Sequence, residues 1–223
     1  MEQLNEQMPF KPYYQDERCT IYNADCRKVL PWLGPFDLLL TDPPYGLGDK
    51  WKTGGWRDGN CGRGRLWDAS VADWDTRPAK HVIDAAIAHG RDAVVWGGNY
   101  FGLPEARCWL LWDKDANMDQ AHAEMAWTTL DKPVRKLKLS PLGVFGNGGA
   151  NGERKEHPTQ KPLALMRWCL SLVPEAQTVL DPFMGSGTTL LACKLDGRNA
   201  VGIELNEAYC EAAAERLRQG VLF

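Results

Sequence analysis

One acid, two prolines and a tyrosine, Asp42-Pro43-Pro44-Tyr45, directly follow the apolar run Phe36–Thr41. The prolines fix the backbone and remove two N–H donors, so the backbone carbonyls and the Asp42 carboxylate remain as acceptors held in place. Two fixed acceptors suit an exocyclic amino group, which offers two N–H donors, and the Tyr45 ring suits a flat base as a stacking partner. Taken alone, the tetrapeptide is explained equally well as a rigid turn that ends a strand.

A second unusual loop, Asp181–Thr189, lies between a short apolar run and a helical pattern. Its Phe183-x-Gly185-x-Gly187 spacing lets the backbone turn tightly and approach a ligand with no Cβ in the way. The free N–H groups of the helix that begins at Thr188 favour an anion. A tight strand-to-helix turn without a ligand is the simpler interpretation of the glycine spacing alone.

Glu204 strengthens the ligand interpretation of this loop. It lies about twenty positions after the glycines, at the end of the next apolar run, where a nucleoside-binding fold places a carboxylate for the ribose hydroxyls. The third glycine of the dinucleotide fingerprint is absent, because Leu190 stands in its place. The sequence therefore favours a nucleoside without a pyrophosphate and argues against a dinucleotide oxidoreductase.

Short strands and helices alternate around both loops. We predict strands over Cys19–Asn23, Phe36–Thr41, Ala93–Trp96, Trp109–Trp112, Leu137–Val144, Thr178–Leu180 and Ala200–Ile203. We predict helices over Pro78–His89, Pro162–Val173, Thr188–Leu195 and Glu207–Arg218, and a helical turn over Lys28–Trp32. This alternation is typical of an α/β fold whose mostly parallel sheet is covered by helices on both faces. Ligands bind such sheets beyond the carboxyl ends of the strands, where both loops are expected.

The composition is that of a single globular domain spanning the 223 residues. No apolar run approaches the ~20 residues that cross a bilayer, and residues 1–14 lack the apolar core of a signal peptide. We therefore expect a cytoplasmic protein with no membrane association. Seven scattered cysteines, never spaced Cys-x-x-Cys, indicate reduced thiols, and no metal site is expected.

A net charge of −3 does not by itself indicate a nucleic-acid-binding protein. The basic residues are unevenly distributed, however, with one group in the glycine-rich stretch Gly46–Arg65, which is expected to be a mobile loop, and a second formed by Lys132, Arg135, Lys136 and Lys138. Local basic patches bind phosphates whatever the total charge. Two solvated surfaces explain the charges equally well.

The motifs and their order resemble the β-class DNA amino-methyltransferases, which are specific for adenine N6 or cytosine N4. In that family an Asp/Asn/Ser-Pro-Pro-Tyr/Phe catalytic motif precedes a Phe-x-Gly-x-Gly cofactor motif. Asn23–Cys26 is similar to the family's acidic position near the cofactor adenine, and His157–Pro162 matches its His-Pro-x-Gln-Lys-Pro signature. The resemblance covers most of the chain. It implies a circularly permuted Rossmann-like methyltransferase fold, as if the ring of elements had been cut before Cys19.

The resemblance also implies S-adenosylmethionine as cofactor and a base flipped out of double-stranded DNA as target. Asp42 and the Pro43 carbonyl would orient the amino nitrogen, and Tyr45 would stack on the base. The implied catalytic residues are Asp42, Pro43, Pro44 and Tyr45. The implied cofactor-binding residues are Asp25, Lys161, Asp181, Phe183, Gly185, Gly187, Thr188 and Glu204. Among them Glu204 would bind the ribose, Asp25 a group near the adenine, and Lys161 would shape the methionine end, whereas His157 fits a rigid start to a helix slightly better.

An aspartate at the first position of the tetrapeptide favours adenine N6, with cytosine N4 as the alternative. An RNA or protein amide methyltransferase is disfavoured by the order of the motifs, and an inactive DNA-binding relative by the competent residue at every expected position. A target-recognition insert is expected over residues 111–149 or in the loop at 46–65, with Lys132, Arg135, Lys136 and Lys138 as candidate DNA contacts. Either segment is small beside the ~1,000 Å² that a specific DNA interface buries, so we predict a homodimer.

Overall fold

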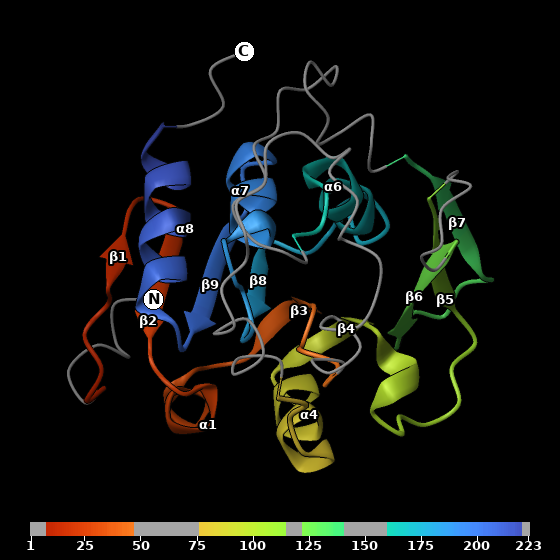
Figure 1. The fold of residues 1–223 in the computed structure, drawn as a ribbon, viewed down its shortest axis with the longest axis horizontal. Helices are drawn as coiled ribbons and strands as arrows, with labels where there is room; N and C mark the ends of the chain where they lie inside the picture. The colour runs from red at the N-terminus through yellow and green to blue at the C-terminus, as the bar shows by residue number, and fades with distance from the viewer. Residues whose placement is uncertain (1–7, 47–75, 115–121, 141–159, 220–223) are drawn as a thin grey trace, which may run out of the picture.

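The structure, a computed structural model, describes residues 8–46, 76–114, 122–140 and 160–219. Their strands form one nine-stranded sheet in the order β1-β2-β9-β8-β3-β4-β6-β5-β7 (Figure 1). The strands are β1 (Tyr14–Gln15), β2 (Cys19–Asn23), β3 (Phe36–Thr41), β4 (Gly90–Trp96), β5 (Trp109–Asp113), β6 (Ala123–Thr128), β7 (Arg135–Lys138), β8 (Thr178–Asp181) and β9 (Asn199–Glu204). The five neighbours β2, β9, β8, β3 and β4 all run parallel, as the sequence predicts.

Helices cover both faces of this parallel region (Figure 1). The helical elements are α1 (Cys26–Val29), η2 (Leu30–Trp32), α4 (Lys80–Ile87), η3 (Gly98–Tyr100), α6 (Leu163–Ser171), α7 (Thr188–Leu195) and α8 (Glu207–Gln219). Because successive strand residues point to opposite faces, Leu38 and Leu40 of β3 are buried with α6, α7 and α8, while Leu39 is buried with α1 and α4. The predicted two-sided α/β fold is therefore confirmed.

Proline flanks both ends of β3. The strand begins directly after Pro35 and ends two residues before Pro43. Proline has no N–H to give to a strand ladder, so the pairing stops where the apolar run stops. β8 pairs with β3 through Leu38–Val179 and Leu39–Leu180, although some 140 residues separate them in sequence. The permuted order thus brings the two predicted loops to one edge of the sheet.

The far side of the sheet differs from the sequence prediction. β6 was not predicted. It runs antiparallel between β4 and β5, so the first residues of β6 lie beside the carboxyl end of β4. The predicted strand Leu137–Val144 is wrong in its bounds, because β7 covers Arg135–Lys138; residues 141–144 lie outside the described residues. β7 pairs with β5 and forms one edge of the sheet as described. Apart from Gly46, the predicted loop at 46–65 also lies outside the described residues.

Two further predictions concern the cysteines and membrane association. The six cysteines in the described ranges are free and buried, in agreement with the prediction of reduced thiols. None of the helices in those ranges combines the length and the apolar character that spanning a membrane requires.

Candidate active site

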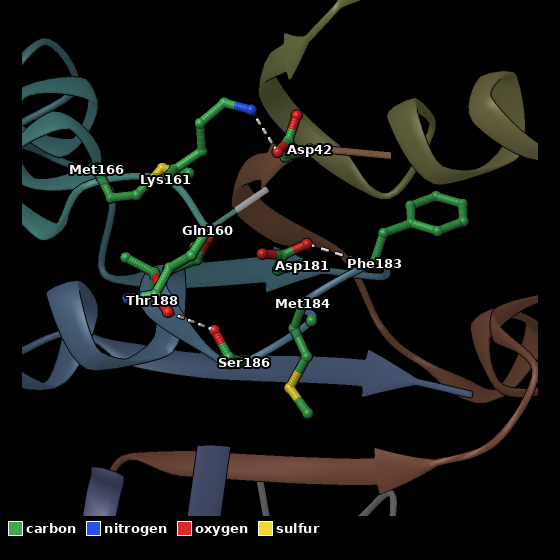
Figure 2. Close-up of a pocket in the computed structure, with 11 residues that line it drawn as sticks. Asp42, Gln160, Lys161, Met166, Asp181, Phe183, Met184, Ser186 and Thr188 are labelled. Carbon is green, nitrogen blue, oxygen red and sulfur yellow. Dashed lines mark hydrogen bonds and ion pairs between the residues drawn. The ribbon is translucent and has the colours of Figure 1, made fainter. Parts of the chain in front are cut away.

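The two predicted loops line one pocket at the carboxyl ends of β3 and β8. Asp42 follows β3, Asp181 ends β8, and both side chains line the pocket together with the loop that leads into α7 (Figure 2). Gln160, Lys161 and Met166 complete the lining from the segment that begins α6. The structure therefore brings the predicted catalytic acid and most of the predicted cofactor residues to one cavity. Asp25 and Glu204 are not part of its lining.

Asp181 is a buried carboxylate that joins the two loops. Its Oδ1 accepts hydrogen bonds from Thr41 Oγ1 at 2.7 Å and from the Phe183 N–H at 3.2 Å. Burial raises the pKa of Asp181 to about 6, against the hydrogen bonds from Thr189 and Thr41, which lower it. The side chain thus carries its charge at neutral pH at the expense of folding free energy, which is typical of a functional site.

Glu204 is held at the end of β9 by backbone donors. Its Oε2 accepts a hydrogen bond from the Gly185 N–H at 3.1 Å, and its Oε1 accepts one from the Asn206 N–H at 2.8 Å. Burial raises the pKa of Glu204, and these N–H groups oppose the rise. Because Gly185 lines the pocket, Glu204 lies directly behind the pocket wall, and its predicted ribose contact stays a prediction.

The glycines of this loop have a packing role that the sequence did not reveal. Gly187 has φ +75°, and a Cβ built on it would lie 2.7 Å from the Cβ of Ala213 in α8. Arg216, one turn further along α8, donates to the Ser186 carbonyl at 2.6 Å and to Thr188 Oγ1 at 3.2 Å. At Gly187 the missing Cβ therefore admits α8 rather than a ligand. Gly185 also has a positive φ, of +50°.

Two other predicted cofactor residues have structural contacts of their own. Phe183 is partly buried and packs against the apolar cluster beneath α1 and α4. Asp25 is the N-cap of α1, where it accepts from the Arg27 N–H at 3.0 Å and pairs with the Arg27 guanidinium at 2.5 Å. Helix capping accounts for an acid at this position. A role for Asp25 near the adenine stays a prediction.

Asp42 is engaged on both carboxylate oxygens. Tyr45 donates its hydroxyl to Oδ1 at 2.5 Å, and Lys161 donates its ammonium to Oδ2 at 2.5 Å. Figure 2 shows the Lys161 side chain reaching from the start of α6 to the carboxylate. The predicted place of Lys161 at the methionine end of the cofactor site stays a prediction; its ammonium contacts Asp42, the predicted catalytic acid. Burial and the nearby Glu124 carboxylate raise the pKa of Asp42, and Lys161 opposes them.

Glu124 is a site residue that the sequence analysis missed. It lies near the start of β6, and the antiparallel pairing of β6 with β4 carries it to the pocket side of the sheet. Its Oε2 lies 3.1 Å from Lys161 Nζ, and its Oε1 lies 2.5 Å from Lys114 Nζ. Burial would raise the pKa of Glu124, but the two ammonium groups lower it to about 2. The strand was not predicted, so no sequence signal pointed to this carboxylate.

Tyr45 already has an aromatic neighbour. Its ring stacks on Tyr100 with a centroid separation of 4.9 Å and an interplanar angle of 22°. A Cβ on Gly97 would lie 2.1 Å from the Tyr45 ring, so that glycine lets the ring settle against the end of β4. Tyr45 is therefore preorganised between Asp42 and Tyr100. Its stacking on a flipped base stays a prediction.

The predicted DNA-contacting residues fall into different surroundings. The half-buried Lys132 donates its ammonium to the Leu172 carbonyl at the end of α6. Lys136 pairs with Asp113 at 3.1 Å, while Arg135 and Lys138 lie on the edge strand β7. Lys132 thus donates a hydrogen bond to a carbonyl at the end of a helix, where the last carbonyls have no partner within the helix. The other three remain candidates for DNA contact.

Adjacent parallel strands that end in an acidic loop and a glycine-rich loop, with both loops lining one pocket, define a Rossmann-like α/β fold. A family model described as DNA methylase, N6_N4_Mtase, matches residues 95–215. The type II methyltransferase M.HpaI of Haemophilus parainfluenzae is 52% identical over an alignment that covers 81% of this chain and 68% of that protein. M.ScaI of Streptomyces caespitosus is 26% identical and covers 93% and 84% of the two chains. This chain belongs to the N6/N4 family of DNA methylases, as the motif resemblance predicted.

Solved structures agree with this fold. A structure titled PvuII DNA methyltransferase (cytosine-N4-specific) aligns with a TM-score of 0.61 at 18% identity, covering 94% of this chain and 89% of that one. The structure titled M1.HpyAVI-SAM complex aligns with a TM-score of 0.58 at 24% identity, covering 89% and 98%. At these identities the likeness establishes the fold and not the target base.

Proposed function

We propose that the protein transfers the methyl group of S-adenosylmethionine to the N6 amino group of an adenine flipped out of double-stranded DNA. The observation that carries the proposal is the buried Asp42 carboxylate, which shares one pocket with the glycine-rich loop. The family supplies the coarser statement, that the chain is an S-adenosylmethionine-dependent DNA methyltransferase of the N6/N4 class. Its type II relatives support a place in a restriction-modification system.

The charge of the pocket fits this cofactor. S-adenosylmethionine carries a sulfonium and an ammonium group, and when bound it supplies an electrophilic methyl group. The Asp181 carboxylate lines the pocket and complements those positive charges, whereas the charge of Asp42 is paired there with the Lys161 ammonium. Glu204, whose two oxygens are oriented by the N–H groups of Gly185 and Asn206, supports a ribose contact at the adjoining wall.

The chain's own residues would act by orientation and electrostatics. Asp42 Oδ2 and the Pro43 carbonyl would accept the two N–H groups of the target amine, which directs the nitrogen lone pair toward the cofactor. The same contacts would stabilise the positive charge that develops on the nitrogen as the new N–C bond forms. Tyr45, fixed by Asp42 and Tyr100, offers a ring against which the base can stack.

Adenine is favoured over cytosine by the aspartate at the first position of the tetrapeptide. Cytosine N4 is the second candidate, because the N6/N4 family to which the chain belongs covers both bases. A homodimer stays a prediction, and the molar mass in solution, measured by light scattering, tests it.

Analysis of the methylated base decides between these candidates. The protein is expressed in a methylation-deficient host, and the genomic DNA is digested to nucleosides and measured by mass spectrometry. We expect N6-methyladenine, and we expect none in cells that express Asp42→Ala. N4-methylcytosine alone would overturn the choice of base, and the absence of both products would overturn the proposed activity.

A further inference from the structure

Four charged side chains form a continuous row at the pocket, in the order Asp42, Lys161, Glu124 and Lys114; Lys161 is buried and the other three are partly buried. The Nζ of Lys161 lies 2.5 Å from Asp42 Oδ2 and 3.1 Å from Glu124 Oε2, and Lys114 lies 2.5 Å from the other Glu124 oxygen. The row combines two negative and two positive charges. Because Glu124 comes from β6 and Lys114 directly follows β5, two strands outside the parallel region complete the row.

Two donors already engage the carboxylate that the target amine needs. The proposed function requires Asp42 Oδ2 to accept an N–H group, and Lys161 donates to that oxygen while Tyr45 donates to the other, so the amine must compete with the Lys161 ammonium for a well-aligned contact. The Lys161 side chain is only 5% exposed, so its ammonium is poorly hydrated. An unpaired buried ammonium is strongly destabilising. A second acceptor within reach would let Lys161 leave Asp42 while its charge stays paired.

Glu124 provides that acceptor. Its Oε2 is buried and accepts no hydrogen bond of good geometry from the described residues, although Lys161 Nζ lies at 3.1 Å. Lys114 holds the other oxygen and thereby fixes the carboxylate. A small rotation of the Lys161 ammonium would align it with Glu124 while its charge stays paired. The indole of Trp96, whose centroid lies 6.0 Å from Nζ, flanks this path with an aromatic face.

We propose that Lys161 is a positioning residue that passes from Asp42 to Glu124 when the target amino group docks. The inference rests on the proposed function. Before the target docks, Lys161 favours the ionised form of Asp42 and holds it in place; in the substrate complex Glu124 retains Lys161 and frees Asp42 Oδ2. No covalent step and no net proton transfer is involved, since the ammonium exchanges one carboxylate partner for another.

Two variants separate this exchange from a purely structural ion pair. In Glu124→Gln the second acceptor is neutral, so Lys161 stays on Asp42; we expect the single-turnover rate to fall at least about tenfold, with unchanged affinity for S-adenosylhomocysteine.

In Lys161→Met the charged and titratable neighbours of Asp42 are Tyr45, Glu124 and Asp181, none of them a cation. We therefore expect the acidic limb of the kcat–pH profile to move to higher pH by about one unit or more. Lys161→Arg keeps a cation and should leave the limb near its wild-type position.

Matched controls carry the same substitutions on the surface. Lys80→Met removes the ammonium paired with Asp84, and Glu211→Gln the carboxylate paired with Arg218, and both should keep the wild-type rate and pH profile. Thermal unfolding verifies that each variant is folded.

Should Lys161→Met fail to fold, Glu124→Gln and Lys161→Arg still decide the question. A wild-type rate in Glu124→Gln, or an unmoved limb in folded Lys161→Met, would overturn the exchange. A wild-type protein that forms no methylated base would instead overturn the proposed function.

Discussion

The two halves of the site are built differently. In the proposed cofactor half, Asp181–Thr189 and Glu204, backbone N–H groups hold Glu204, threonine hydroxyls and one N–H hold Asp181, and the loop is shaped by glycines. In the catalytic half, Asp42–Tyr45 with Glu124 and Lys161, a carboxylate is held by side chains from distant parts of the chain. The cofactor half should therefore be sensitive to backbone geometry, and the catalytic half to charge balance.

The largest expected effect is on the catalytic half. Asp42→Ala removes the acceptor for the target amine and leaves Lys161 with only Glu124 as a charged partner. We expect methyl transfer to DNA, followed with a tritiated methyl group, to fall by roughly 100-fold to 1,000-fold, as when one preorganised electrostatic group is lost from an active site. Asp131→Ala, at an exposed aspartate, is the control. Substantial residual turnover would remove Asp42 from the reaction.

The cofactor half should respond most strongly to a methyl group on its backbone. Gly187→Ala forces a Cβ against Ala213 at 2.7 Å and strains a φ of +75°, whereas Gly197→Ala imposes a similar strain at φ +73° with no atom within 4 Å. We expect urea denaturation to show Gly187→Ala losing about 1–3 kcal/mol more of the free energy of unfolding than Gly197→Ala. Equal losses would mean that α8 accommodates the Cβ and does not shape the loop.

Asp181 gives a pH-dependent prediction. Its pKa of about 6 in the folded protein lies above the ordinary 3.8, so the folded state binds the proton more tightly than the unfolded state. This proton stabilises the fold below pH 4, and the stabilisation is lost as the pH rises from 3.8 through about 6, by up to about 3 kcal/mol. Asp181→Asn should therefore raise the Tm relative to wild type at pH 7.5 more than at pH 4. An identical difference at both pH values would contradict the raised pKa.

The smallest effects concern DNA and fall outside both halves. If Arg135 and Lys138 contact phosphates from the edge strand, Arg135→Ala and Lys138→Ala should each lower the salt slope of log K by roughly one unit on cognate and unrelated duplexes alike. Lys132→Ala should leave the slope unchanged and lower the free energy of unfolding by about 1 kcal/mol, because its ammonium donates to the Leu172 carbonyl. Unchanged slopes in all three would favour the alternative that the basic residues protect the sheet edge from pairing.

Most of the parallel region could be predicted because its local patterns agree with its environment. The apolar run Phe36–Thr41 has the same bounds as β3, and the pattern Glu207–Arg218 matches α8 to one residue. β6 was missed because Ala123–Thr128 neither alternates nor forms an apolar run, and its inner half is buried by other parts of the chain, among them β4, β5 and η3. The exposed basic residues Arg135 and Lys136 likewise kept the start of β7 out of the predicted strand.

The same distinction holds within the site. Asp42, Asp181 and Glu204 each end a predictable parallel strand, so their meeting at one edge follows from the topology. Glu124 and the position of the Lys161 ammonium depend on an antiparallel strand and on long side-chain reach, and neither leaves a periodic signal in the sequence. Gly187 was expected to admit a ligand, but the partner that needs the space is Ala213 in α8.

Calorimetric titration with S-adenosylhomocysteine tests most directly whether the site has two separable halves. Wild type, Asp42→Ala and Glu204→Ala are titrated at one pH without DNA. We expect Asp42→Ala to bind within about twofold of wild type and Glu204→Ala to lose on the order of 1.5–3 kcal/mol, the free energy of hydrogen bonds to a charged group. The account would be contradicted if Glu204→Ala bound like wild type while Asp42→Ala lost its affinity, because the carboxylate after β3 would then belong to the cofactor.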